Sequence, residues 1–321
     1  WIDHVNSGGG VNGQTITLLS MDDKFDPKLA AENARVLIEE KNVVALFLTR
    51  GTPHAQAVIP LLDKHGVALV GPSTGAMVLH QPVQKYVFNV RATYQREAER
   101  AIAHLASIGM TRIAVVYADD SFGTDGVAGA NKGFAATKLT PSTELKFDRS
   151  KPDFSMIAPA VAKTNPQAVI FIASGQHVTD GIAALRKTGS QAQVVTLSNN
   201  ASGGFVKSLG DNARGTIVTQ VFPNERAAGY KMVSEAMQIG AKSGVTQLSP
   251  AMLEGYAAAK VMVEALRRAG PKPTREKVVA ALNGLKKFDL GGLEVGYGED
   301  DHTGLDFADL SIIGADGRFR R

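Results

Sequence analysis

The sequence predicts an α/β protein built from two doubly wound parallel sheets, on three observations. Short runs of Val, Ile and Leu alternate with amphipathic helical stretches along most of the chain, a pattern typical of parallel strands that helices cover on both faces. The alternation runs through one set of elements before residue 110 and a second set after it. The length of 321 residues fits two domains at roughly 150 residues each.

The chain opens on what reads as the end of a helix. Trp1–Asn6 places Ile2 and Val5 on one face and runs into three glycines that stop a helix. We therefore expect an earlier strand and the start of this helix upstream. After it, the pairs Asp26-Pro27 and Thr52-Pro53 each combine an N-cap with a first-turn proline. The expected strands are Thr15–Ser20, Val43–Leu48, Val67–Val70 and Tyr86–Val90, and the expected helices are Pro27–Lys41, Thr52–His65 and Tyr94–Ile108.

The second half repeats the alternation and then becomes helical. The expected strands are Ile113–Tyr117, Glu144–Phe147, Ala168–Ile172, Val194–Leu197 and Thr216–Val221, and the expected helices are Thr124–Thr137, Phe154–Lys163, Val178–Lys187 and Gly204–Leu209. Three helical stretches follow between Ala227 and Asn283, and Leu293–Val295 and Phe307–Ile313 are expected as late strands.

Composition excludes several classes of function. The net charge of +4 is scattered along the chain, which argues against a nucleic-acid surface. With no cysteine there is no disulfide or thiolate nucleophile. The longest apolar runs are far shorter than the about 20 residues of a membrane span.

The motifs do not indicate a metal or a cofactor. No two histidines have the spacing that places ligands on one face of a helix, so no metal is expected. Gly8–Gly13 matches a dinucleotide fingerprint, but a strand follows it instead of preceding it, so no cofactor is expected either.

Neutral polar residues gather in the loops after the expected strands. In open α/β sheets these loops meet at the carboxyl edge of the sheet, where helix N-termini favour anions. Hydroxyl and amide groups there suit a small polar molecule that is held without reaction. The candidate ligand-binding residues on this ground are Thr52, Ser73, Thr74, Gln176, Asn199 and Asn200, with Tyr94, Phe122 and His177 as possible walls.

An enzymatic alternative comes from the same loops. Gly71-Pro-Ser73-Thr-Gly75 has the G-x-S-x-G form of a hydrolase nucleophile elbow and follows a strand. Asp180 or Asp289 with His302 could complete a triad. The elbow needs a substantial helix after the serine, however, and Gln81-Pro82 cuts that helix short. A ligand-binding loop without catalytic residues is the preferred interpretation.

Several strings, in this order, resemble the type I periplasmic solute-binding proteins of ABC importers, in the branch of the leucine/isoleucine/valine-binding proteins. They are Gly9-Gly-Val-Asn-Gly13, Gly51-Thr-Pro53, Gly71-Pro-Ser-Thr-Gly75, Tyr86-Val-Phe-Asn-Val-Arg-Ala-Thr-Tyr94, Asp119-Asp-Ser-Phe-Gly123, Leu185-Arg-Lys-Thr-Gly189 and Gly304-Leu-Asp-Phe307. The resemblance implies two lobes joined by three hinge crossings with the ligand cleft between them. We expect residues 1–91 with 224–305 in lobe 1, and 92–223 with 306–321 in lobe 2.

The resemblance also implies a function. A non-enzymatic receptor of the periplasm, with its signal peptide already removed, would bind a small carboxylate-bearing solute and present it, as a monomer, to a membrane permease. The resemblance implies that the residues binding the ligand carboxylate are Thr52, Ser73 and Gly75, and that the aromatic ring of the closing lobe is Phe122. It places further ligand contacts at Gln176 and His177.

The sequence departs from the family in two ways, and these leave the chemical identity of the ligand undecided. Amino-acid binders offer a carboxylate to the ligand ammonium from the loop that here reads Leu197-Ser-Asn-Asn-Ala201, which holds no acid. A branched-chain or aromatic amino acid and the matching oxo or hydroxy acid therefore remain alternatives. The family's first strand and the loop after it, which lines the cleft, would lie upstream of Trp1.

A ligand-sensing regulatory module is a further alternative, because such modules share the fold. The DNA-binding or membrane segment that such a module normally carries is not visible in this sequence.

Overall fold

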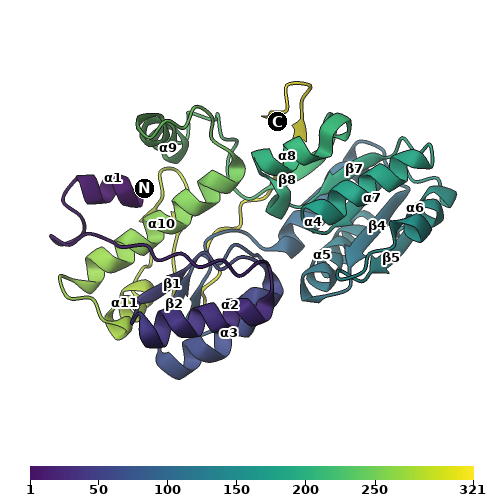
Figure 1. Ribbon diagram of the computed structural model, residues 1–321. Coiled ribbons are helices and arrows are strands. Elements are labelled where there is room, and N and C mark those ends of the chain that lie inside the picture. The colour runs from purple at the N-terminus through teal and green to yellow at the C-terminus, as the bar shows by residue number, and fades with distance from the viewer. The chain divides into compact units, whose positions relative to one another are not determined.

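The computed structural model describes all 321 residues, which divide into two compact units (Figure 1). The first unit comprises residues 1–92, 225–248 and 252–306. The second comprises residues 93–224, 249–251 and 307–321. Each unit contains its own parallel sheet, as the repeated alternation in the sequence predicts.

The first unit is built on the three-stranded parallel sheet β1-β2-β3. Its strands are β1 (Ala45–Phe47), β2 (Ala68–Val70) and β3 (Val87–Phe88), and its helices are α1 (Ile2–Ser7), α2 (Pro27–Arg35), α3 (Thr52–His65), α9 (Lys231–Lys242), most of α10 (Pro250–Ala269) and α11 (Arg275–Asn283). The short strands β9 (Phe288–Asp289) and β10 (Glu294–Val295) form a separate antiparallel pair. In Figure 1, β1 and β2 lie between α2 and α3 on one side and α10 on the other.

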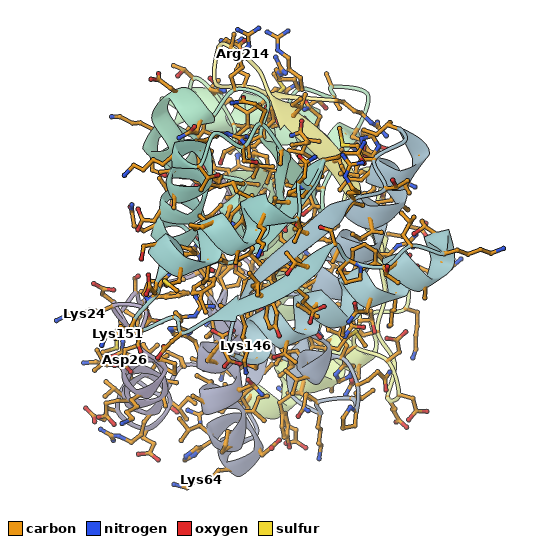
Figure 2. The ribbon with its side chains drawn as sticks, turned by 90° about the vertical axis from the view of Figure 1, so that its right-hand side faces the viewer. Lys24, Asp26, Lys64, Lys146, Lys151 and Arg214 are labelled. Atoms are coloured by element: carbon orange, nitrogen blue, oxygen red, sulfur yellow. The ribbon has the colours of Figure 1, made fainter.

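The cap signals in the sequence explain where the first helices begin. The Asp26 carboxylate accepts hydrogen bonds from the main-chain N–H groups of Lys28 and Leu29, and Pro27 begins α2. Residues 36–40 continue α2 as a π-helical turn. α3 ends at Gly66, whose positive φ of 62° closes the helix. The Lys64 side chain in its last turn lies at the surface (Figure 2) and forms an exposed ion pair with Glu39 at 3.3 Å.

The expected strand at Thr15–Ser20 is wrong. The segment belongs to no sheet, and the main chain of Ile16 is held by the side chain of Asn6, which donates to its carbonyl and accepts from its N–H. Leu18 and Leu19 are 59% and 44% exposed. The β-rich composition gives a preference for extended backbone, but a strand forms only where a neighbour supplies hydrogen-bond partners, and none lies beside this segment.

The second unit contains a seven-stranded sheet in the order β12-β11-β8-β7-β6-β4-β5. Strands β8, β7, β6, β4 and β5 are parallel, whereas β11 and β12 add an antiparallel edge that the expectation of a parallel sheet did not include. The strands are β4 (Ile113–Ala118), β5 (Thr143–Phe147), β6 (Ala168–Ile172), β7 (Gln193–Thr196), β8 (Ile217–Gln220), β11 (Asp309–Ile313) and β12 (Phe319–Arg320); the helices are α4 (Tyr94–Ser107), α5 (Ser121–Thr137), α6 (Phe154–Lys163), α7 (Gln176–Lys187) and α8 (Gly203–Leu209).

Helix α5 begins at Ser121, earlier than the expected Thr124, because Asp120 caps it by accepting from the Gly123 N–H at 3.0 Å. Its glycines allow it to pack closely on α4. A Cβ on Gly129 would lie 2.4 Å from the Cα of Gln95, and one on Gly133 would lie 2.7 Å from the side chain of Ile102. This contact holds the first turn of α4, which carries Tyr94, against the middle of α5.

Buried His80 makes the stability of the protein pH-dependent. Its side chain is 1% exposed and neither ring nitrogen has a hydrogen-bond partner. Burial, with a smaller contribution from the charge of Arg91, lowers the pKa of His80 to about 4. The unfolded chain, with a His pKa near 6.5, therefore binds a proton that the folded chain does not, and stability falls as the pH drops from about 6.5 towards 4.

We expect His80→Phe to remove this contribution. Between pH 7.5 and 4.5 the parent should lose about 2–3 kcal/mol of unfolding free energy more than the variant does. Urea unfolding at both pH values measures the difference, and His4→Phe, at an exposed position, is the control. Equal losses in the parent and in His80→Phe would show that His80 is not the group responsible.

Candidate functional site

In the first unit, the loops after β1 and β2 meet at the first turn of α3. The N–H of Ser73 donates to the carbonyl of Thr49 at 2.9 Å. The hydroxyls of Thr52 and Thr74 lie 2.7 Å apart and are almost fully buried, at 1% and 0% exposure. The structure therefore brings Thr52 beside the neighbouring residues Ser73 and Thr74, although Thr52 and Thr74 lie 22 positions apart in the sequence.

The chemistry of this cluster suits an anionic oxygen. Only one of the two hydroxyl protons can lie between Thr52 and Thr74, so the other proton is not used by this pair. The main-chain N–H groups of a helix's first turn have no partner within the helix, and the helix dipole adds partial positive charge there. Ser73, half-buried in the adjoining loop, supplies a further hydroxyl. Donors of this kind suit a small anion such as a carboxylate.

Sequence reasoning missed His54, which lies in the same first turn. Its ring is 2% exposed, packs 4.4 Å from the Phe25 ring, and has no hydrogen-bond partner on either nitrogen. Gly51, at φ 95°, makes room for it, because a Cβ there would lie 2.6 Å from its Nδ1. The only signal in the sequence is a polar side chain at the third position of a helix, and this does not indicate that the ring is buried.

The serine hydrolase alternative is wrong. Only the short 3₁₀ turn Met77–Leu79 follows Ser73, in place of the helix that a nucleophile elbow requires. The ring nitrogens of His302 bond instead to the carbonyls of Gln84 and Val87 and to the side chain of Asn283. The Asp289 carboxylate accepts from the main-chain N–H groups of the glycine turn at residues 291–292.

In the second unit, Tyr94 and Phe122 form an edge-to-face pair with ring centroids 4.8 Å apart. Both are largely buried, at 2% and 4% exposure. The Arg149 guanidinium lies 5.8 Å from the Phe122 ring, and its Nε donates to the Asp120 carboxylate at 2.5 Å. Arg149, which the sequence did not indicate, thus ties the cap of α5 to the aromatic pair.

Gln176 and His177 lie in the first turn of α7. The Gln176 amide is exposed and donates to the Asp180 carboxylate at 2.7 Å. His177 is half-buried, with its ring 5.7 Å from that of Phe147. Both side chains thus lie at the carboxyl end of β6, where the sequence places them.

Asn199 and Asn200 bind the neighbouring loop of their own unit. The Asn200 amide oxygen accepts from the Gly175 N–H at 2.8 Å, and its amide nitrogen donates to the Ala173 carbonyl and the Thr196 hydroxyl, both at 2.9 Å. Asn199 donates to Ala173 and to the Ser174 hydroxyl. Asn200 is 1% exposed, so both ends of its amide are used to hold the loop that leads into α7.

A buried carboxylate, Glu97, lies beneath this loop and was also missed. It has 0% exposure, and it accepts from the main-chain N–H of Ser198 at 2.9 Å, from the Ser198 hydroxyl at 3.0 Å and from the Thr219 hydroxyl. These bonds join the first turn of α4 to the ends of β7 and β8. A single acidic residue in an amphipathic helix gives no sequence signal for such a role.

Two α/β units with neutral, hydrogen-bonding loops at the carboxyl ends of their strands are typical of solute-binding proteins. The comparison with known families agrees, since the periplasmic binding protein family model matches residues 1–308. The chain belongs to the periplasmic binding protein family. None of its helices combines the length and the apolar character that a membrane-crossing segment needs.

Solved and curated relatives are similar over nearly the whole chain. A substrate-binding periplasmic protein from Ralstonia solanacearum is 32% identical, with a TM-score of 0.88, over 99% of this chain and 92% of that one. A possible leucine/isoleucine/valine-binding protein from Rhodopirellula baltica is 26% identical, with a TM-score of 0.89, over 100% of this chain and 89% of that one. The Leu/Ile/Val-binding protein homolog 3 of Brucella melitensis is 25% identical over 93% of this chain and 80% of its own length.

We expect Glu97→Gln to loosen the loops after β6 and β7. A glutamine cannot accept from all three donors, because one of its two terminal atoms is itself a donor. The loss should lower the free energy of unfolding by about 1.5–3 kcal/mol and speed amide exchange at Gly175. Urea unfolding and residue-resolved hydrogen exchange measure the two effects. Glu99→Gln, on the half-exposed side of the same helix, should change stability by less than about 0.5 kcal/mol; equal effects of the two variants would contradict the role given to Glu97.

Proposed function

We propose that this protein is the periplasmic receptor of an ABC importer and that it binds a small organic acid through its carboxylate. The observation that carries the proposal is the buried Thr52–Thr74 hydroxyl pair at the start of α3, beside the Ser73 loop. A carboxylate there gains charge-assisted hydrogen bonds and the favourable end of a helix dipole. Gly75 and the loop residues around it complete the donor set.

The relatives support an amino acid or a related acid as the solute. Those from Brucella melitensis and Rhizobium johnstonii are named Leu/Ile/Val-binding proteins, and each is 25% identical to this chain. A branched or aromatic carbon skeleton would suit the apolar surface of Tyr94 and Phe122 in the second unit. Gln176, His177 and Asn199 are our candidates for further contacts, and Asn200, whose amide is bonded within the unit, would hold their loop in place.

Four acids near the candidate loops of the second unit already have partners within the protein. Asp119 pairs with Lys146 at 3.0 Å, and Asp120 pairs with Arg149. Asp180 accepts from Gln176, and Glu97 accepts from three donors of its own unit. A desolvated ammonium needs a counter-charge, and each of these carboxylates already has a partner. We therefore include 2-oxo and hydroxy acids in the proposed solute class.

The mode of action follows from the domain organisation. We propose that residues 1–91 with 224–305 and residues 92–223 with 306–321 act as the two lobes, and that the three crossings near residues 91–95, 221–224 and 303–308 act as a hinge. Ligand binding would shift the equilibrium towards a closed form that the permease recognises. The receptor would act as a monomer. Mass spectrometry of the small molecules released when the purified protein is denatured tests the proposal directly, because a solute outside the carboxylates would contradict it.

We expect Thr52→Val and Ser73→Ala to weaken ligand binding. Each removes a hydroxyl from the proposed carboxylate grip, and the loss of one charge-assisted hydrogen bond of about 1.5–3 kcal/mol lowers affinity roughly ten- to hundredfold. Calorimetry with the identified solute measures the change. Ser7→Ala, at an exposed hydroxyl in α1, should bind like the parent. If both site variants also bind like the parent, the carboxylate lies elsewhere.

We expect deaminated acids to stabilise the protein at least as well as the matching amino acids. A thermal-shift screen compares 4-methyl-2-oxopentanoate with leucine and phenylpyruvate with phenylalanine, since a ligand stabilises the folded state by mass action. Stabilisation by the amino acids alone would show that an ammonium partner exists and would remove the oxo acids from the solute class.

A further inference from the structure

A partly exposed aromatic ring lies beside the first turn of α3 in the first unit. The Phe25 side chain is 43% exposed. A Cβ on Gly51, the residue that precedes α3, would lie 3.3 Å from this ring. The ring therefore packs against the residue before Thr52, whose hydroxyl belongs to the proposed carboxylate site.

The main chain holds Phe25 in a conformation that a bulky residue rarely adopts. Lys24 and Phe25 have positive φ angles of 49° and 57°, in the left-handed region that is unfavourable for residues with a large side chain. The carboxylates of Asp22 and Asp23 accept hydrogen bonds from the N–H groups of Lys24 and Phe25, both at 2.8 Å. Strain of this kind persists only where the surroundings enforce it, so the turn fixes the backbone from which the ring extends.

The buried ring of His54 supports Phe25 from one side. The two ring centroids lie 4.4 Å apart, with 34° between the ring planes. His54 is 2% exposed and neither of its nitrogens has a hydrogen-bond partner. A buried polar group without hydrogen bonds is unfavourable, and a leucine would fill the same position without that loss. What a leucine would not supply is a flat aromatic face against Phe25.

Arg50 adds a positive charge beside the same ring. Its guanidinium lies 5.9 Å from the centre of the Phe25 ring, within the range of a cation–π contact. The main chain of Arg50 forms a parallel bridge with Ser73, so this charge belongs to the loops of the proposed site and favours an anionic solute. His54 and Arg50 together hold the orientation of the Phe25 ring, and the exposed part of the ring can still receive a flat apolar group.

We propose that Phe25 is a specificity-determining residue of the solute site and that the solute is an aromatic acid. The inference rests on the proposed function, because it requires that the carboxylate binds at Thr52. A carboxylate bound there brings the carbon skeleton of the solute close to Gly51 and Phe25. An aromatic ring in edge-to-face or offset contact with Phe25 gains more than the area that it buries, whereas a saturated ring of the same size does not. The site therefore selects aromatic acids over their saturated counterparts.

Matched pairs of acids test this proposal. The pairs are benzoate with cyclohexanecarboxylate, phenylacetate with cyclohexylacetate, and phenylpropanoate with cyclohexylpropanoate. The members of a pair share the carboxylate and the size of the ring, and they differ only in whether the ring is aromatic. Calorimetry measures the dissociation constants for the parent, for Phe25→Leu and for Phe25→Tyr. The control is Phe288→Leu, which removes an aromatic ring from the β9–β10 pair of the same unit.

We expect the parent to bind the aromatic member of a pair about three- to tenfold more tightly than the saturated member. Phe25→Leu should abolish this preference, whereas Phe25→Tyr and Phe288→Leu should keep it. A parent that binds both members equally, or a Phe25→Leu variant that still prefers the aromatic member, would overturn the proposal and leave the carboxylate site in place. If no acid of either kind binds to the parent, the proposed function is wrong and this inference is wrong with it.

Discussion

Parallel strand pairing is the constraint on which the rest of this structure depends. It requires helices between successive strands, it buries both faces of each sheet, and it brings the loops after the strands to one edge. The Thr52–Thr74 pair in the first unit and the Ser198–Asn200 loop in the second exist because neighbouring strands end side by side.

Buried polar side chains then fix the loops that pairing brings together. Glu97 holds the ends of β7 and β8, and Asn200 holds the end of β6. A buried carboxylate or amide is costly unless all its hydrogen bonds are made, so these contacts allow few alternative loop conformations. A binding protein benefits from this, because donors that are already in place lose little entropy when the ligand arrives.

The sequence predicted the bounds of helices and strands better than it predicted the contacts of individual side chains. Helix α6 and strand β6 were predicted residue for residue, because periodicity and cap signals are local. The sequence predicted Asn200 as a ligand contact and gave Glu97 no role, because an amide in a loop and an acid on a helix look the same whether they face a ligand or another loop. His54 and Arg149 were missed because burial and ring contacts depend on residues far away in the sequence.

The sequence by itself determined the α/β class and the order of nearly all helices and strands, because periodicity, spacing and capping chemistry are local. The order of its motifs indicated the family by resemblance, and the loops proposed for solute binding stay a prediction. Only the tertiary structure decided that Thr15–Ser20 stays unpaired, that an antiparallel edge joins the second sheet, and which polar groups the protein uses itself. Strand pairing and hydrogen bonding depend on which residues are neighbours in space. The order of residues in the sequence does not show these neighbours.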